Sequence, residues 1–348
     1  MKTGKSLVEL AIELERQSQA KTDYIADTKV LVMTPTGSLT INNDSAQEFP
    51  ITDHAHTQIA ARLDIPARYY NRMKSEVPHL LAANVNEWFQ SKPERRMMRT
   101  LDGKLRAFLS DRYRRLDNFD LASAALPILA QMGEGIEIVS SELTGSRMYI
   151  KAINRRLELE VKKGDVVQAG VCITNSEVGL GSLKVEPLVY RLVCTNGMIA
   201  QDYATKKYHV GRVADEGEAY ELYSDETLKA DDKAFYLKVQ DTVRAAVDVA
   251  KFGQIVNRMQ AATEQKIEGN PVAAVEVLSE KFGYDNEEKS GILTHLIQGG
   301  DLTAYGLLNA ITRTSQDLTD YDRATELERD GSKVLSLPQA TWKAIATA

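Results

Sequence analysis

The sequence predicts an α+β protein in which an antiparallel β-sheet core, with a basic β-hairpin and flanking helices, is followed by a mainly helical C-terminal lobe. Three observations predict this class. Strand-like runs follow one another between residues 137 and 208 with only short turns between them, which favours antiparallel pairing over βαβ crossovers. Residues 92–115 combine a hairpin turn signal with many basic residues. From residue 231 onward, apolar residues recur at helical spacing.

Length and composition indicate an ordinary soluble protein of two domains. The chain has 348 residues, 43% of them hydrophobic and 26% charged, and a formal net charge of −6. An acidic stretch, Asp215 to Asp232, divides it into an α+β domain (residues 1–214) and a helical region (215–348). We find no apolar run of about 18 residues and no secretory signal, so we expect a cytoplasmic protein without membrane contact.

The two cysteines, Cys172 and Cys194, both lie within strand-like apolar runs. In a chain without a secretory signal they are expected to be buried, reduced thiols. The cysteines and histidines show no zinc-binding spacing, and the closest histidine pair, His54 and His56, is expected at the surface near a helix start. We therefore predict no metal site and no cofactor.

The chain before residue 92 is predicted to form an opening hairpin and several helices. The hairpin joins Tyr24–Met33 to Ser38–Ile41 through a turn at Pro35-Thr36-Gly37. A first helix over residues 6–14 carries one apolar stripe. The later helices are expected to begin with Asp53 as N-cap, at Ile65-Pro66, and at Pro78, the last running to Trp88 and Phe89.

The segment from Lys92 to Arg115 is strongly basic. It holds nine Lys and Arg residues against three acids, a balance of +6 in a chain whose total is −6. An acidic protein that concentrates positive charge in one segment is expected to have an anionic partner there. The alternative is that these arginines pair with acids elsewhere in the chain.

This basic segment is predicted to be a β-hairpin. Asp102-Gly103 is a type I′ turn signal between two runs of alternating character, 96–101 and 104–109. A period of 2 in the second run places one set of side chains on each face. One face carries Leu105, Ala107 and Leu109, and the other carries Lys104, Arg106 and Phe108. Basic side chains beside an aromatic ring suit a phosphate backbone with stacked bases.

The strand-rich section follows a helix that Asp117 or Asn118 is expected to cap. Turn signals such as Lys163-Gly164-Asp165 and Asn196-Gly197 separate the runs. Gly179 and Gly181 are expected at the tip of a long hairpin, because no phosphate-loop context surrounds them. The predicted strands are 137–143, 147–154, 157–161, 166–175, 183–195 and 198–208.

The C-terminal region is predicted to be helical to its end. A long amphipathic helix is expected within Asp231–Gln265, and the tail is expected to dock through Trp342 and Ile345. Further helices are predicted near 271–282, 286–298, 302–316 and 320–329. We find no catalytic motif of a known type, so enzyme activity is a minority hypothesis.

Three segments carry a resemblance to a known family. LRAFLSDRYRRLDNFDL (105–121), NSEVGLGSLKVEPLVYRLVCTNGM (175–198) and LTAYGLLNAITRTSQDLTDYDRATELERDG (302–331) resemble the phage and plasmid proteins of domain of unknown function 932. The resemblance implies a protein of a mobile element in a bacterial cell, without catalytic residues to transfer. The order of hairpin, helix and antiparallel strands is also similar to the core of ring-forming strand-annealing recombinases, which is a likeness of fold only.

These observations favour a nucleic-acid-binding protein of a phage, plasmid or integrated element, which binds single strands and promotes annealing or recombination. We expect a homo-oligomer. The alternatives are a self-assembling or partner-binding factor whose basic hairpin meets an acidic protein surface, and an enzyme of unrecognised type. The residues assigned to nucleic-acid binding are Arg95, Arg96, Arg99, Lys104, Arg106, Phe108, Arg112, Tyr113, Arg114 and Arg115, with Tyr190 as a further stacking candidate.

Overall fold

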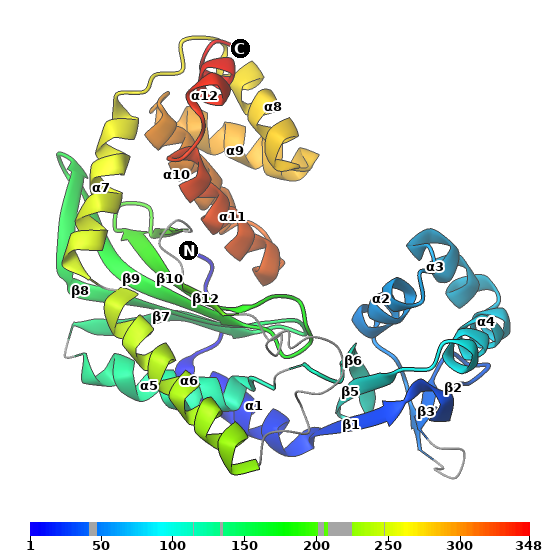
Figure 1. Ribbon diagram of the computed structural model, residues 1–348. Coiled ribbons are helices and arrows are strands. Elements are labelled where there is room, and N and C mark those ends of the chain that lie inside the picture. Colours follow the sequence, from blue (N-terminus) through cyan, green and yellow to red (C-terminus); the bar gives the residue numbers. More distant parts are fainter. Residues whose placement is uncertain (42–46, 114, 133–134, 201–204, 208–224, 247) are drawn as a thin grey trace.

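The computed structural model describes residues 1–41, 47–113, 115–132, 135–200, 205–207, 225–246 and 248–348. Within these residues it shows a large antiparallel sheet with helices on both sides, a small N-terminal lobe beside it, and a cluster of helices at the C-terminal end (Figure 1). The predicted class is therefore confirmed: an α+β fold with antiparallel sheets and a mainly helical C-terminal region.

The main sheet has the strand order β11-β10-β9-β8-β7, and β12 pairs with β10. Every neighbouring pair along it is antiparallel, as the short predicted turns require. The strands are β7 (Ile136–Leu143), β8 (Met148–Lys162), β9 (Asp165–Asn175), β10 (Leu183–Arg191), β11 (Asn196–Ile199) and β12 (Thr205–Lys207).

Several strand boundaries differ from the prediction. The predicted turn at Asn196-Gly197 is wrong, because these two residues begin β11, which ends at Ile199. The predicted strands 147–154 and 157–161 form one strand, β8, because the chain makes a register shift between Asn154 and Glu158 rather than a turn. The next difference is at β10, which ends at Arg191 instead of continuing to Thr195. Thr195 has a φ of 51° and therefore lies in a turn before β11.

One face of the main sheet is covered by α1 (Leu7–Ala20), α5 (Asn118–Gln131) and α6 (Asp225–Ala246) (Figure 1). Ser6 and Glu9 form a capping box at the start of α1. Leu121 of α5, Val171 of β9 and Phe235 of α6 share the core on this face. Because α6 packs here, part of the predicted helical region belongs to the core of the sheet. The predicted boundary at 214/215 lies outside the described residues.

The opposite face and one end of the sheet carry the helices that follow α6. Val167 of β9 and Met198 of β11 share a core with Ile255 and Leu308 of this group. The predicted helix within 231–265 is in fact two helices, since Asp248 caps a new one by accepting from the Lys251 N–H. The helices are α7 (Val249–Thr263), α8 (Pro271–Phe282), α9 (Asn286–Gly299), α10 (Ala304–Thr314), α11 (Tyr321–Val334) and α12 (Gln339–Ala346).

The C-terminal tail docks as predicted: Ile345 of α12 is buried in the same core, and Trp342 packs against it. Among the described residues, no helix combines the length and apolar character needed to cross a membrane.

The N-terminal lobe contains two small sheets and three helices. The sheet β1-β5-β6 joins the lobe to the rest of the chain, and the sheet β2-β3-β4 contains a hairpin with the predicted turn. The predicted first strand, Tyr24–Met33, is interrupted by η1, so only Leu31–Met33 belongs to this hairpin. Thr52, rather than Asp53, caps the first of the three helices. The elements are β1 (Lys21–Asp27), the 3₁₀ helix η1 (Thr28–Val30), β2 (Leu31–Met33), β3 (Leu39–Ile41), β4 (Glu48–Phe49), α2 (Asp53–Arg62), α3 (Ala67–Glu76), α4 (Pro78–Ser91), β5 (Arg95–Leu101) and β6 (Lys104–Ser110).

Candidate nucleic-acid interface

The predicted basic hairpin is present as β5 and β6. The two strands pair antiparallel from Arg96 opposite Ser110 to Leu101 opposite Lys104. Asp102 and Gly103 have φ angles of 50° and 71°, and two successive positive φ values are what a type I′ turn requires. The local turn signal therefore identified both the hairpin and its centre.

A β-bulge changes which side chains share a face of β6. Arg99 pairs with Ala107 and Thr100 pairs with Leu105, which leaves Arg106 as an extra residue. Consequently Leu105 and Phe108 pack in the same lobe core, whereas Ala107 and Leu109 pack in another cluster. The predicted faces, with Phe108 beside Lys104 and Arg106, are therefore wrong, because strict alternation assumes a strand without an inserted residue.

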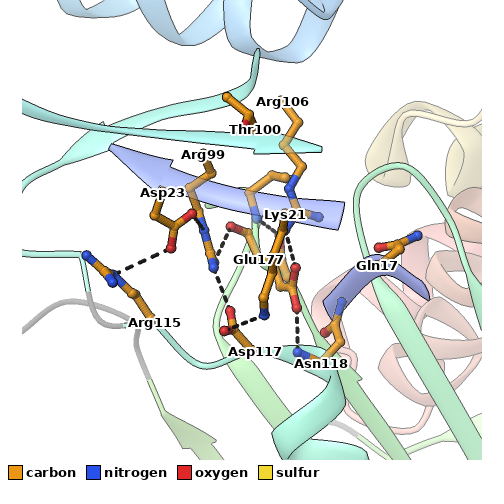
Figure 2. A network of polar contacts seen from close by, with 12 residues as sticks. Gln17, Lys21, Asp23, Arg99, Thr100, Arg106, Arg115, Asp117, Asn118 and Glu177 are labelled. Carbon is orange, nitrogen blue, oxygen red and sulfur yellow. Dashed lines mark hydrogen bonds and ion pairs between the residues drawn. The ribbon is translucent and has the colours of Figure 1, made fainter. Parts of the chain in front are cut away.

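Arg99 is fully buried where the hairpin meets the main sheet (Figure 2). Its Nε donates to Asp23 Oδ1 at 2.8 Å and its Nη2 to Asp117 Oδ1 at 2.6 Å. Its Nη1 donates to the backbone oxygen of Glu177 at 3.1 Å. Lys21 Nζ lies 2.5 Å from the other oxygen of Asp117. The guanidinium thus connects β1, α5 and the β9–β10 loop.

Arg106, the bulge residue, is also buried and forms an ion pair with Glu177. Glu177 is 5% exposed, and its second oxygen accepts from the Asn118 N–H at 2.5 Å, at the start of α5. Arg115 Nε lies 3.5 Å from Asp23 on the outer side of the network. We call Lys21, Asp23, Arg99, Arg106, Asp117 and Glu177 the inter-lobe network.

Nearby opposite charges keep Arg99 and Asp117 ionised. Burial by itself favours the neutral form of Arg99, but Asp117 and Asp23 outweigh burial and raise its pKa above the usual value. Burial would likewise raise the pKa of Asp117, yet Arg99 and Lys21 lower it below 3.8. Arg99 and Arg106, at the centre of the hairpin, therefore stabilise the contact between the lobes. This agrees with the alternative in which the arginines pair with acids elsewhere in the chain.

The β9–β10 loop (residues 176–182) holds the hairpin by further contacts. The Val178 oxygen accepts from His54 Nε2 and from Gln58 Nε2, both at 2.8 Å. Tyr113 Oη donates to the Ser176 oxygen at 2.9 Å. Gly179 has a φ of 79°, and a Cβ there would lie 2.6 Å from Leu109 Cδ2. Only glycine fits at position 179 of this loop without strain.

The remaining predicted binding residues lie at different places. Arg95, Lys104, Arg112 and Arg115 are exposed, with Lys104 beside the hairpin turn. Arg96 is mostly covered, with its guanidinium carbon 5.0 Å from the centre of the buried Phe108 ring. Arg114 lies outside the described residues. Tyr190 is on β10 and packs against the buried cluster around Cys172. The structure therefore does not bring the described members of the predicted set onto one surface.

An exposed cationic and aromatic surface does form at the base of the hairpin, away from its turn. Asp27 pairs with Arg95 at the start of β5, so Lys29 of η1 lies close to that strand. Trp88, near the end of α4, is 37% exposed, and Lys92 Nζ lies 4.9 Å from its ring centre. Arg112 follows the end of β6, which pairs with the start of β5. We call Lys29, Trp88, Lys92, Arg95 and Arg112 the hairpin-base patch.

The sequence analysis did not predict that Trp88 is exposed. Helical spacing placed it with Phe89 at the end of α4, but only Phe89 is buried, where its ring stacks on Phe108 at 5.9 Å between centroids. The signal that could have identified it is Lys92 one turn later, since cations often lie over exposed tryptophan rings. Among the described residues, no group of three His, Cys, Asp or Glu side chains could hold a metal ion.

Comparison with known proteins identifies the family of this chain. No curated protein and no solved structure matches the chain. The family model described as "Domain of unknown function (DUF932)" matches residues 107–333, which is well over half of the chain. The match begins within β6 and ends in α11, so it includes the main sheet and most of the helical region. This protein therefore belongs to the DUF932 family.

Proposed function

We propose that this protein binds single-stranded nucleic acid through the hairpin-base patch. The observation that carries the proposal is the exposed ring of Trp88 beside the ammonium group of Lys92, within a cluster of cations on neighbouring elements. Sequence-tolerant binding of single strands combines cations that contact the backbone with aromatic rings on which bases stack. A duplex hides its base faces, so stacking on Trp88 favours single strands.

Charge distribution supports the same conclusion. The chain is acidic overall, with a net charge of −6, yet Lys29, Lys92, Arg95 and Arg112 are all exposed at one end of the hairpin. The cations at the centre of the same segment are neutralised by Asp23, Asp117 and Glu177. Exposed cations are therefore present at the hairpin base, where a polyanion would contact them.

The inter-lobe network gives this surface a fixed shape. Arg99 and Arg106 join the hairpin to α5 and to the β9–β10 loop, so the strand pair that carries Arg95 is fixed on the rest of the chain. Preorganised cations lose less conformational entropy when a ligand binds. The proposal extends to strand annealing by a homo-oligomer in a bacterial cytoplasm, in line with the resemblance to annealing recombinases.

Fluorescence anisotropy with labelled single-stranded DNA, single-stranded RNA and duplex DNA tests the proposal. At low salt we expect the wild-type protein to bind both single strands more tightly than duplex, and the affinity to fall steeply as salt increases. Arg95→Glu should weaken single-strand binding by about tenfold, the effect of reversing one phosphate contact. Trp88→Ala should weaken it by about as much, through lost stacking.

The matched control is Lys238→Glu, which makes the same change of charge at an exposed position of α6. It should leave binding unchanged. If no single strand binds at low salt, or if Arg95→Glu and Lys238→Glu weaken binding equally, the patch is not the binding surface. Salt-sensitive self-association without affinity for nucleic acid would instead favour the partner-binding alternative.

A further inference from the structure

We propose that the DUF932 domain contains a second site, independent of the hairpin-base patch, which binds the phosphoryl group of a nucleotide. The site is a polar pocket of about 250 Å³ between the β9–β10 loop and α11, with Phe282 of α8 among its lining residues. All of its lining residues fall within the family match. It is lined by five cations: Arg147, Lys184, Arg323, Arg329 and Lys333.

The pocket is formed by segments that are distant in sequence, and two of them supply most of its lining. The β9–β10 loop supplies one wall, and α11 supplies the other with residues spaced by three and four positions, which places them on one helix face. Three buried interactions fix α11 on the sheet. Lys151 donates to Glu328 at 2.7 Å, Arg329 donates to Glu186, and Ser140 shares a hydrogen bond of 2.6 Å with Tyr321. The pocket walls are therefore rigidly placed.

The arginines of the pocket are held by acids behind them. Arg329 is 6% exposed, and it donates to Glu186 Oε2 at 3.0 and 2.7 Å and to Thr174 Oγ1 at 2.9 Å. Arg323 donates to both oxygens of the buried Glu288, at 2.5 and 2.8 Å. These contacts orient the guanidinium groups before any ligand arrives, so binding an anion orders few side chains.

Donors remain for an anion after these contacts. A guanidinium carries five N–H donors. Among the described residues, Arg329 Nη1 has no acceptor, because Arg329 donates through Nε and Nη2 only. Lys333 has a half-exposed side chain whose ammonium group lies 2.6 Å from Asp330. Arginine and lysine groups that converge on one pocket are the usual ligands of phosphate oxygens.

Other residues that line the pocket suit contacts with the base and the sugar of a nucleotide, which a phosphate ion lacks. Phe282 offers a ring face for a base, and Lys333 Nζ lies 5.6 Å from its centre, so a phosphate and a ring would be bound side by side. Asn175 is fully buried, and its Oδ1 has no hydrogen-bond partner in the described part of the chain. With Glu326 and Asp330 it supplies acceptors for hydroxyl or amino groups.

The size of the pocket limits the ligand. Ligand pockets commonly measure about 300–1,000 Å³, so this one, at about 250 Å³, suits a mononucleotide or a smaller phosphorylated molecule. The phosphoryl group can come from two sources, a free nucleotide or the phosphate of a nucleic-acid strand. Both present the same anionic oxygens beside a planar ring.

Isothermal titration calorimetry on the full chain separates these possibilities. The probes are AMP, adenosine, inorganic phosphate and a 5′-phosphorylated oligonucleotide. We expect AMP to bind saturably and more tightly than phosphate, and adenosine to bind far more weakly than AMP. Lys333→Gln and Lys184→Gln should each weaken AMP binding by about tenfold, the loss expected for one charge-assisted hydrogen bond. Thermal unfolding checks that both variants remain folded.

Two controls keep this site distinct from the hairpin-base patch. Lys281→Gln removes an exposed cation of α8 that does not line the pocket, and it should leave AMP binding unchanged. Arg95→Glu should also leave it unchanged, even if that variant abolishes binding of long single strands. Displacement of AMP by the phosphorylated oligonucleotide would assign the pocket to a strand terminus, and absence of displacement would assign it to a free nucleotide.

The proposal is overturned if none of the phosphorylated probes binds saturably to the wild-type protein. It is also overturned if both pocket variants bind AMP as tightly as the Lys281→Gln control does.

Discussion

Arginines at the centre and at the base of the basic segment have different roles. At the centre, Arg99 is fully buried and Arg106 is 9% exposed, and each faces carboxylates from other parts of the chain. At the base, Arg95, Arg112 and Trp88 are exposed. The comparison teaches that a cluster of positive charge in sequence identifies neither a binding site nor a structural contact until the opposing groups are known.

Solvation explains why the two parts differ. A buried charge without a partner costs several kcal/mol, so the central arginines require Asp23, Asp117 and Glu177. An exposed cation stays hydrated and does not require a buried counter-charge. Variants in these two parts of the segment should therefore affect different properties. Variants at the centre should change stability, and variants at the base should change binding.

Replacing Arg99 should have the largest effect. Arg99→Met keeps much of the buried volume but leaves Asp23 and Asp117 without their main counter-charge, and we expect a loss of about 3–5 kcal/mol in the free energy of unfolding. Urea denaturation followed by circular dichroism measures this loss. A change below about 1 kcal/mol would show that the central cations behave like surface charges.

The loop that closes the network should be the next most sensitive. Gly179→Ala places a Cβ 2.6 Å from Leu109 Cδ2 at a φ of 79°, so steric overlap adds to backbone strain, and we expect a loss of about 2–3 kcal/mol. Gly103→Ala is the matched control, because its φ is 71° but no atom lies within 4 Å. It should cost only about 1–2 kcal/mol. Equal losses would mean that packing at Gly179 does not matter.

These two glycines illustrate what the sequence can reveal. The turn at Asp102-Gly103 depends on local backbone preference and was predicted, whereas the fit of Gly179 against Leu109 depends on a contact across 70 residues of chain. The partners of Arg99 and Arg106 were unpredictable for the same reason, since Asp23 and Glu177 lie 76 and 71 residues away.

Other parts of the fold followed local patterns and were predicted correctly. The antiparallel order of the main sheet follows from its short turns, and most helices of the C-terminal region follow from apolar spacing. The bulge at Arg106 was missed because it adds one residue to an otherwise regular strand. The pocket at α11 was missed because its walls come from distant segments that only the folded chain brings together.

Acid should weaken the N-terminal lobe through His56, which is buried without an acidic partner. Burial, with Lys74 nearby, lowers the pKa of His56 from 6.5 to about 4, and its Nδ1 shares a hydrogen bond of 2.9 Å with Tyr70. The unfolded chain takes up a proton near pH 6.5 while the folded chain resists until about pH 4. The contribution is therefore complete above pH 6.5 and is lost as pH falls toward 4, by about 3 kcal/mol.

Urea denaturation of the wild-type protein and of His56→Gln at pH 7, 5.5 and 4.5 measures this contribution. The difference between the two proteins removes the titration of other groups. We expect the wild type to lose stability more steeply than the variant between pH 6.5 and 4. Parallel curves would show that His56 is protonated in the folded protein or that its site is open to water.

The smallest expected effect on stability is at the hairpin base. Arg95→Glu changes an exposed side chain, and we expect the free energy of unfolding to change by no more than about 0.5 kcal/mol. Urea denaturation of this variant beside Arg99→Met tests the contrast within one strand, since both residues belong to β5. A loss at Arg95 as large as that at Arg99 would remove the distinction between the two parts of the segment.

The most direct test of the central claim uses the fluorescence of Trp88. The chain has two tryptophans, so Trp342→Phe leaves Trp88 as the sole reporter. We predict that titration with single-stranded oligothymidylate at low salt quenches the emission of Trp88 as bases stack on its ring, and that added salt restores it. Binding detected by anisotropy without any change in Trp88 emission would contradict the claim that strands bind at the base of the hairpin.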